Sequence, residues 1–246
     1  MEKIKLDEVK PSSRRTPYLN YQQEKKLHRQ AVVLENLSHG FEDETLFSNG
    51  NLILEGGARL AVIGENGTGK TTFLRCLMGE LSANQGTVKW SDNATHAYCP
   101  QDSSTEFNCE LTLFDWMSQW RKPKHDDLMV RSMLGRLLFT ADDYKKKARV
   151  CSGGEKNRLL FGKLMMSEAN VLILDEPTNH LDMESIEALN QALAKYDGTV
   201  IFVSHDREFV SSLATRVIEI KDRKMINFQG SYDEYLASQM ETLKVA

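Results

Sequence analysis

The feature that most constrains this chain is a glycine-rich loop between two segments of regular structure. Residues 64–72 read GENGTGKTT and satisfy the pattern G-x-x-x-x-G-K-[ST]. The apolar run at residues 60–63 predicts a strand before the loop, and residues 71–78 predict a helix after it. In this context the loop N–H groups and the helix N-terminus converge on one point, where they attract an anion. The sequence therefore predicts a phosphate-binding loop.

Two side chains of the loop have predicted roles of their own. Lys70 is expected to reach the β and γ phosphates of a nucleotide, and the Thr71 hydroxyl is expected to bind Mg²⁺. The alternative is a glycine-rich turn with an exposed lysine, but strand, loop and helix together favour the phosphate site. The loop residues expected to surround the phosphates are Gly64, Glu65, Asn66, Gly67, Thr68, Gly69, Lys70, Thr71 and Thr72.

Further apolar runs predict an α/β fold. Residues 171–174 and 200–203 are uninterrupted apolar strings, which are typical of central parallel strands buried on both faces. Residues 32–34 and 52–54 predict additional strands, and residues 215–229 predict a hairpin. Because predicted helices alternate with these strands, we expect a layered α/β architecture.

The predicted helices fall into two groups. Residues 111–149 carry apolar side chains at helical spacing and no strand pattern, which predicts a small helical subdomain, over about residues 103–165, inserted in the α/β core. Elsewhere, Asp182 is expected to cap the N-terminus of one helix, and residues 230–231 to introduce a final short helix.

Charge is unevenly distributed along the chain. Residues 1–30 hold eight Lys and Arg against four Asp and Glu, a local charge of +4, so the net charge of −4 leaves −8 for the rest. Pro11 and Pro17 exclude a continuous helix there, and we expect a basic linker or arm over residues 1–30 before a domain over residues 31–246. Such an arm can contact nucleic acid, although most charged runs are simply solvated.

Composition excludes several classes of protein. With 246 residues, 41% hydrophobic and 27% charged, the chain is long and apolar enough for a buried core. Its apolar strings are far shorter than the ~20 residues of a membrane span, and we expect no signal sequence, because the first residues are charged and include no apolar run. The four cysteines form no C-x-x-C pair, which favours reduced thiols. We expect a cytoplasmic location.

Polar residues follow the predicted strands where an α/β sheet presents ligands. Asp175 and Glu176 end a buried strand, and we expect Asp175 to hold Mg²⁺ and Glu176 to polarise the attacking water. Gln101 and His205 also come after apolar segments. Taken alone, the two acids can be solvated, Gln101 can be an ordinary loop amide, and His205 can be structural. Together with a phosphate loop, these residues indicate one site.

Residues 152–155 have two compatible interpretations. Ser152 and Glu155 match a capping box at the start of a helix. The Ser152 hydroxyl and the N–H groups of Gly153 and Gly154 at the same helix start also form a second anion site.

These motifs, in this order, resemble the nucleotide-binding domain of ATP-binding cassette (ABC) proteins over about residues 31–230. The resemblance implies an ABC-type P-loop NTPase core with a mostly parallel central sheet, an N-terminal antiparallel β portion and an inserted helical subdomain. It implies ATP and Mg²⁺ as cofactors, and Gln101 as the residue that links Mg²⁺ and the attacking water to the helical subdomain. His205 is implied to contact the γ-phosphate.

The resemblance also implies contacts with a second domain. Ser152 and Gly154 belong to the signature that contacts a γ-phosphate bound by another ABC domain, and Asp182 is the acid of the D-loop. Phe41 matches the aromatic residue that stacks on adenine, although Phe47 lies nearby and either can be core. Cys151 departs from the leucine that usually begins the signature, and we expect only a modest effect on packing.

Residues 175–182, DEPTNHLD, and residues 230–236, GSYDEYL, are similar to the soluble ABC-F class. Members of that class are tandem ATPases that bind the ribosome and act as translation factors, so the implied partners are a second ABC domain, rRNA and tRNA, with no membrane insertion. The chain has one phosphate loop and one signature, and each of them belongs to a different nucleotide site that a second domain completes. We therefore expect Mg-ATP binding but slow hydrolysis by this chain alone. In this resemblance residues 1–30 match the end of an interdomain linker.

Two other functions are compatible with parts of this sequence. The first is the ATP-hydrolysing subunit of a membrane transporter, in which residues 111–149 dock a permease helix; Asn179 and His180 oppose this, because transporters usually have Ser and Ala there. The second is a module that binds ATP without turnover. The basic run at residues 145–149 is either an rRNA contact or a solvated loop.

Overall fold

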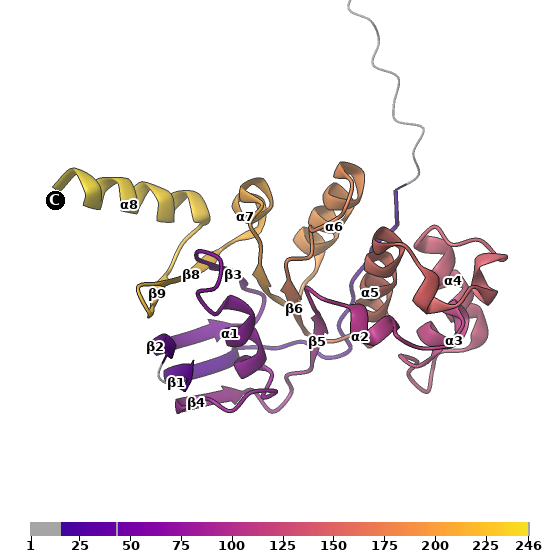
Figure 1. The fold of residues 1–246 in the computed structure, drawn as a ribbon, viewed down its shortest axis with the longest axis horizontal. Helices are drawn as coiled ribbons and strands as arrows, with labels where there is room; N and C mark the ends of the chain where they lie inside the picture. Colours follow the sequence, from indigo (N-terminus) through magenta and orange to yellow (C-terminus); the bar gives the residue numbers. More distant parts are fainter. Residues whose placement is uncertain (1–15, 43, 246) are drawn as a thin grey trace, which may run out of the picture.

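The computed structural model describes residues 16–42 and 44–245, and its central feature is one curled sheet (Figure 1). Within these residues the sheet has nine strands in the order β4-β1-β2-β9-β8-β3-β7-β6-β5. The strands are β1 (Gln30–Phe41), β2 (Glu44–Glu55), β3 (Arg59–Ile63), β4 (Gln85–Trp90), β5 (His96–Cys99), β6 (Val171–Asp175), β7 (Thr199–Val203), β8 (Arg216–Lys221) and β9 (Lys224–Phe228).

Helices connect these strands and cover the sheet. The α-helices are α1 (Lys70–Leu77), α2 (Ser104–Phe107), α3 (Leu113–Ser118), α4 (Asp127–Arg136), α5 (Gly153–Ser167), α6 (Met183–Lys195), α7 (Arg207–Leu213) and α8 (Tyr232–Val245). Two short 3₁₀ helices are η1 (Asp143–Lys145) and η2 (Ala148–Val150). No helix in the described part of the chain is long and apolar enough to cross a membrane.

The sheet combines a parallel and an antiparallel portion, which confirms the predicted fold class. Strands β5, β6, β7, β3 and β8 pair with one another in parallel, and β4, β1 and β2 pair with one another antiparallel. Strand β9 joins the two portions and is parallel to β2 and antiparallel to β8. All residues of β6 and β7 are buried, as expected of strands covered on both faces. The predicted hairpin is the antiparallel pair of β8 and β9.

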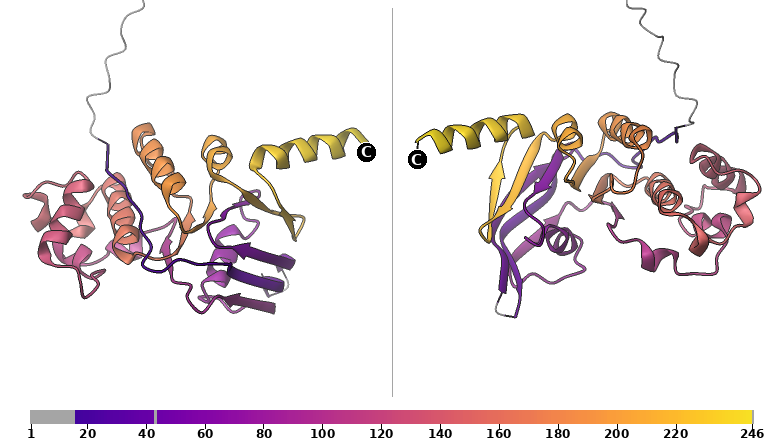
Figure 2. Two further views of the ribbon diagram at one scale, coloured as in Figure 1. Left: turned by 180° about the vertical axis from the view of Figure 1, so that it is seen from behind. Right: turned by 45° about the horizontal axis from the view of Figure 1, so that its top comes forward.

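Two hydrophobic clusters cover the two faces of the parallel strands. Alternate residues of β6 enter different clusters: Leu172 and Leu174 pack with the helices α3 to α7, and Val171 and Ile173 pack with α1 and the antiparallel strands. Helix α1 therefore lies between the two portions of the sheet, on the side opposite α5 to α7 (Figures 1 and 2).

The helices between β5 and β6 gather beside the parallel portion (Figure 1). Their own core is centred on Trp116, which is buried and stacks on Phe107 with ring centroids 4.7 Å apart. Thr112 and Asp126 cap the N-termini of α3 and α4 with their side chains, which explains where these helices begin.

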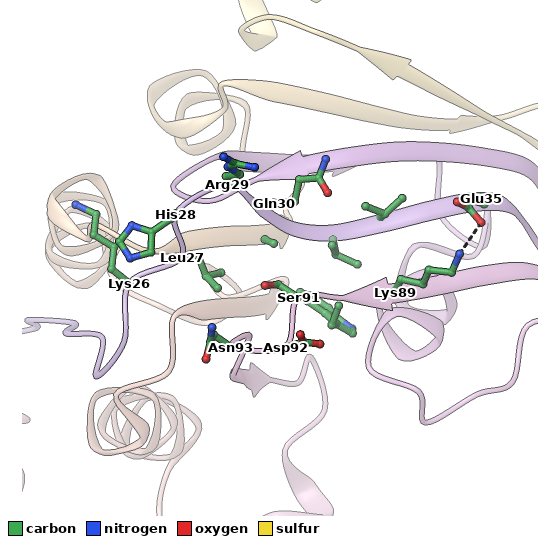
Figure 3. Close-up of a pocket in the computed structure, with 14 residues that line it drawn as sticks. Lys26, Leu27, His28, Arg29, Gln30, Glu35, Lys89, Ser91, Asp92 and Asn93 are labelled. Atoms are coloured by element: carbon green, nitrogen blue, oxygen red, sulfur yellow. Dashed lines mark hydrogen bonds and ion pairs between the residues drawn. The ribbon is translucent and has the colours of Figure 1, made fainter.

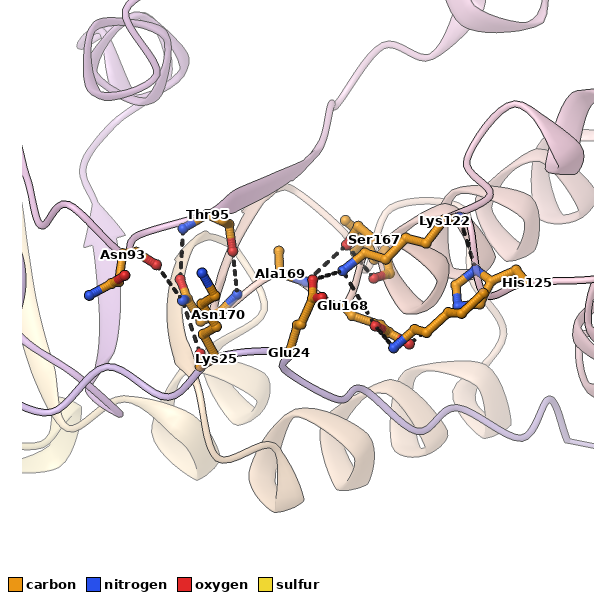
Figure 4. A network of polar contacts seen from close by, with 12 residues as sticks. Glu24, Lys25, Asn93, Thr95, Lys122, His125, Ser167, Glu168, Ala169 and Asn170 are labelled. Atoms are coloured by element: carbon orange, nitrogen blue, oxygen red, sulfur yellow. Dashed lines mark hydrogen bonds and ion pairs between the residues drawn. The ribbon is translucent and has the colours of Figure 1, made fainter.

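The segment before β1 runs along the molecule and contacts several elements (Figure 2). Leu19 is buried in the same cluster as α5, and the Tyr18 N–H donates to the carbonyl of Arg136 at 2.9 Å. Figure 4 shows that the buried Asn170 amide donates to the Lys25 carbonyl at 3.0 Å, and that Lys122 pairs with Glu24. Residues 1–15 of the predicted arm lie outside the described residues.

Candidate functional site

Four neighbouring parallel strands open onto one cavity of about 350 Å³ at their carboxyl ends. Strand β3 leads into the glycine-rich loop, β7 into His205, β6 ends at Asp175 and β5 precedes Gln101. This edge is where α/β sheets bind ligands. The cavity is lined by Leu46, Asn66, Gly67, Gly69, Lys70, Thr71, Thr72, Gln101, Asp175, Glu176, Val203 and His205.

The backbone of the loop requires glycine at its two ends. Gly64 has φ +149°, and a Cβ there would lie 2.5 Å from the carbonyl oxygen of Ile220. Gly69 has φ +98° and precedes α1, whose N-terminus no side chain caps. The first N–H groups of α1 therefore remain available to an anion in the cavity.

Lys70 folds back over its own loop. Its Nζ donates to the carbonyl oxygens of Gly64 and Glu65, both at 2.8 Å, and the residue is buried. Burial lowers the pKa of Lys70, while the carboxylates of Glu176 and Asp175 oppose that shift. A phosphate in the cavity would give this ammonium group a stronger acceptor than two neutral carbonyls.

Asp175 presents one bonded and one free oxygen at the end of β6. Its Oδ2 accepts a hydrogen bond from the Tyr98 hydroxyl at 3.4 Å, and the Thr71 side chain also bonds this carboxylate. Its Oδ1 is buried and has no hydrogen-bond partner. Burial raises the pKa of Asp175, and a cation bound at Oδ1 would favour the ionised form.

The donors around Asp175 suit a hard divalent cation. A carboxylate, the Thr71 hydroxyl and the Gln101 amide are oxygen ligands of the kind that Mg²⁺ uses together with phosphate oxygens. Among the described residues, no three His, Cys, Asp or Glu side chains cluster into a metal site. A cation here would therefore depend on the nucleotide phosphates to complete its coordination.

Glu176 lies next to His205 at the centre of the cavity. Its Oε2 accepts from the His205 N–H at 3.2 Å, and Nε2 of the same histidine lies 3.3 Å from Oε1. Burial raises the pKa of Glu176, and the neighbouring His205 partly offsets this rise. Glu176 has φ +50°, a strained value for a non-glycine residue, and its N–H bond to Val203 holds that conformation at 3.0 Å.

Several predicted site residues lie outside this cavity. Ser152 and Glu155 form the predicted capping box of α5: the Ser152 N–H donates to Oε2 of Glu155 at 2.8 Å, and Ser152 Oγ accepts from the Glu155 N–H at 3.4 Å. Asp182 caps α6 through the Ser185 N–H at 2.8 Å, as predicted. The predicted residues that do not line the cavity are Phe41, Gly64, Glu65, Thr68, Ser152, Gly153, Gly154, Glu155 and Asp182.

The structure distinguishes the two phenylalanines proposed for adenine stacking. Phe47 is fully buried and packs edge-on against Phe73, so it belongs to the core. Phe41 is 53% exposed at the end of β1, where its edge contacts the ring of His39. Of the two, only Phe41 is accessible to a ligand.

Sequence reasoning missed Tyr98, which reaches Asp175 from the adjacent strand. The sequence analysis predicts no strand before Gln101, whereas residues 96–99 form β5. The signal that could have identified this strand is the short run Ala97, Tyr98 and Cys99 directly before Pro100.

A larger cavity, of about 600 Å³, lies between residues 26–33 and the end of β4 (Figure 3). Lys26, His28 and Arg29 lie on its rim, and Lys89 pairs with Glu35 at 3.0 Å. Neither a glycine-rich loop nor an acid pair at a strand end lines it. The smaller cavity is therefore the candidate site.

Comparison with known proteins agrees with this geometry. The family model described as "ABC transporter" matches residues 47–179. Among curated relatives, the chain is 59% identical over 97% of its length to "Probable ATP-binding protein YbiT" of Escherichia coli O157:H7, covering 45% of that protein. It is 36% identical over 98% of its length to "ABC transporter F family member 5" of Arabidopsis thaliana, covering 35% of that protein.

The chain thus spans less than half the length of these relatives. Among solved structures, it is similar in fold to a bacterial Atm1-family ABC exporter with ATP bound. The TM-score is 0.74 and the sequence identity 18%, over 92% of this chain and 44% of the other. Because the family model covers more than half of the sequence, the chain belongs to the ABC transporter family, as an ATP-binding domain similar to ABC-F members.

Proposed function

We propose that this chain hydrolyses ATP to ADP and phosphate with Mg²⁺, and that it acts in a pair with a second ABC domain. The observation that carries this proposal is the convergence of Lys70, Thr71, Asp175, Glu176 and His205 on one cavity. Phosphoryl transfer depends mainly on positioning and charge neutralisation, and these side chains supply both.

Each residue of the cavity has a separate task in this proposal. Lys70 neutralises charge on the β and γ phosphates, while Thr71, Gln101 and Asp175 hold Mg²⁺. The metal, when bound, offsets negative charge on the phosphate oxygens. The unpartnered Oδ1 of Asp175 supports this assignment, because a buried oxygen without a hydrogen bond is costly unless a ligand satisfies it.

Glu176 and His205 contact the two reacting groups, the attacking water and the γ-phosphate. Water attacks the γ-phosphorus as the bond to the β-phosphate oxygen breaks and ADP leaves. Glu176 aligns this water by accepting one of its hydrogen bonds, and His205 contacts the γ-phosphate. Their mutual contact at 3.3 Å supports a joint task, because each side chain restricts the orientation of the other.

The proposed partner is a second ABC domain, provided by the same protein or by another copy. Ser152, Gly154 and Asp182 lie outside the cavity that holds the phosphate loop. A phosphate contact by these residues therefore requires a nucleotide bound elsewhere, which a facing domain provides. The Asn157 amide of α5 donates to the Asn179 carbonyl at 2.9 Å, so the signature helix and the segment before Asp182 are linked.

ATP-dependent pairing gives the first test. Glu176→Gln keeps the shape of the side chain but weakens its ability to align water, so ATP should persist and hold two domains together. We expect size-exclusion chromatography with Mg-ATP to shift this variant from monomer to dimer. The same variant without nucleotide is the control. A monomer at high protein concentration with saturating Mg-ATP would contradict the pairing.

We also propose a cytoplasmic role in translation, through binding of the ribosome with its rRNA and tRNA. Similarity to ABC-F members supports this role. The basic run at residues 145–149 is less available to rRNA phosphates than its charge suggests. Lys146 pairs with Glu155, and both Lys147 and Arg149 pair with Glu110. Any rRNA contact must therefore involve the exposed Lys145, basic residues outside this run, or the exchange of these ion pairs.

Co-sedimentation with ribosomes across a salt series tests this role. Binding through rRNA phosphates should weaken at least about tenfold between 50 and 200 mM salt, because each neutralised phosphate releases counterions. Bovine serum albumin at equal concentration is the control for trapping in the pellet. If the chain stays in the supernatant at the lowest salt, with and without Mg-ATP, the ribosomal role is wrong.

A further inference from the structure

The Tyr98 hydroxyl reaches the metal-site carboxylate from the neighbouring strand. Strands β5 and β6 are parallel, and Tyr98 is paired with Ile173, two residues before Asp175. Residues two apart on a strand share one face of the sheet, so Tyr98 and Asp175 are diagonal neighbours, within reach of an aromatic side chain. The hydroxyl lies 3.4 Å from Oδ2 of Asp175.

This contact makes the two carboxylate oxygens of Asp175 unequal. Oδ2 is held by Tyr98, whereas Oδ1 is buried and has no hydrogen-bond partner. Rotation about χ2 of an aspartate is broad and roughly two-fold, so nothing intrinsic to the side chain selects which oxygen faces the cavity. The Tyr98 donor on Oδ2, together with the Thr71 side chain that bonds the same carboxylate, restricts that freedom.

Tyr98 can act only as the donor in this pair. At neutral pH a tyrosine hydroxyl carries a proton, whereas an ionised carboxylate can only accept, so the hydroxyl donates to Oδ2 of Asp175. The ring packs against the cluster formed by α1 and the antiparallel strands, which restricts its movement. A half-buried donor whose ring is packed against this cluster orients its acceptor at a low cost in conformational entropy.

We propose that Tyr98 is a positioning residue for magnesium binding: its hydroxyl holds Oδ2 of Asp175 so that Oδ1 faces the cation that accompanies ATP. This inference rests on the proposed function as a magnesium-dependent ATPase. The same hydrogen bond joins the strand before Gln101 to the strand that ends at Asp175, in addition to the backbone pairing of β5 with β6.

Tyr98→Phe removes the hydroxyl and keeps the ring. The direct measurement is the Mg²⁺ concentration that half-saturates binding of a fluorescent, non-hydrolysable ATP analogue. We expect that concentration to rise about tenfold, because loss of a partner behind a metal ligand typically costs 10- to 100-fold in metal affinity. Nucleotide affinity in EDTA and the melting temperature should stay close to those of the unmodified chain.

Two further variants separate positioning from packing. Tyr144→Phe is the matched control, because its hydroxyl donates to the Arg131 carbonyl at 3.2 Å, in the helical portion. It should leave the Mg²⁺ requirement unchanged. In the Asp175→Asn background, which itself raises the Mg²⁺ requirement, adding Tyr98→Phe should cause no further rise. An independent, additive rise would overturn the proposal.

The outcomes distinguish this inference from the proposed function. If the unmodified chain needs Mg²⁺ for tight binding and Tyr98→Phe needs the same concentration, Tyr98 only packs and the positioning role is wrong. If the unmodified chain binds the analogue equally well with and without Mg²⁺, the proposed function fails and the inference fails with it.

Discussion

Lys70→Ala is expected to lower the rate of ATP hydrolysis by ~10²-fold or more. The Nζ of Lys70 is the cation that we expect to offset charge on the γ-phosphate as the bond breaks. Loss of one preorganised donor of this kind typically costs about 3 kcal/mol of transition-state stabilisation, which corresponds to that change in rate. Phosphate release at saturating Mg-ATP, at one protein concentration for all variants, measures the effect.

The control for Lys70→Ala must separate lost catalysis from a damaged loop. In the structure, Nζ also bonds the carbonyl oxygens of Gly64 and Glu65, so the variant leaves two acceptors without this donor. Melting curves recorded beside the kinetics detect any resulting loss of stability. Lys195→Ala, at an exposed position in the last turn of α6, should retain its rate. A Lys70→Ala rate within threefold of the unmodified chain would exclude the proposed role.

Much of the site could be predicted because short local patterns mark the strand ends. The glycine-rich motif marks the end of β3, and apolar runs followed by a polar residue mark the ends of β6 and β7. No local pattern says that these strands are neighbours, since they lie far apart along the chain and pair through non-local hydrogen bonds. The general rule that α/β sheets bind ligands at the carboxyl ends of their strands suggests one site, but the specific convergence of Lys70, Asp175 and His205 follows from the family resemblance.

The strands that escaped prediction lack a clear hydrophobic pattern. Strand β4 is an edge strand with no buried residue, so its sequence does not alternate between core and solvent. Strand β5 has only four residues, too few for a periodicity. Because β5 was missed, the position of Tyr98 opposite β6, and with it the contact to Asp175, could not be foreseen.

The adenine contact was ambiguous for a related reason. Phe41 and Phe47 are close in sequence, and both precede the phosphate loop. What separates them is the direction of each side chain on its strand: Phe47 faces the core on β2, whereas Phe41 lies at the exposed end of β1. Such directions depend on register, which non-local pairing and the packing of one face determine together.

The segment before β1 was predicted to be a linker or arm because of its charge and its prolines. Charge alone does not indicate which of its side chains pack against the domain. Leu19 and Tyr21 are isolated apolar residues in a polar stretch, yet both are buried in the cluster that contains α5. Two apolar residues cannot define a helical or strand period. Their burial follows from contacts with distant residues, such as the Tyr18 N–H with the Arg136 carbonyl, that a local pattern does not contain.

Arg59→Met is expected to lower the free energy of unfolding by about 3 kcal/mol, because a buried acceptor that loses its donor costs about 1–3 kcal/mol and several carbonyl groups lose a charged donor here. Arg59 begins β3 and is buried, and its guanidinium donates to four backbone carbonyls. Those of Gly57 and Gly198 lie at 2.7 Å and that of Leu193 at 3.1 Å, and the fourth belongs to Tyr196. Methionine fills a similar volume but donates no hydrogen bond.

Two of these carbonyls, those of Leu193 and Tyr196, lie at the C-terminal end of α6, where few backbone donors remain; the Leu193 carbonyl also accepts from the Tyr196 N–H at 3.3 Å. Arg59 therefore caps α6 and joins it to β3. Urea denaturation monitored by circular dichroism measures the loss, and the m-value should not change if the unfolding transition stays two-state. Arg75→Met is the control: Arg75 pairs with Glu80 at 3.3 Å with its side chain 47% exposed, so its loss should cost below about 0.5 kcal/mol.

Because of the position of Arg59, its effect on folding stability can be measured separately from Mg-ATP binding. Arg59 lies at the start of β3, and the phosphate loop follows the other end of the strand. The variant should therefore bind Mg-ATP with unchanged affinity at temperatures where it remains folded, and ligand binding should raise its melting temperature as it does for the unmodified chain. If Arg59→Met and Arg75→Met differ by less than about 1 kcal/mol, the guanidinium does not hold these elements together, and the packing of β3 against β7 and β8 carries the stability instead.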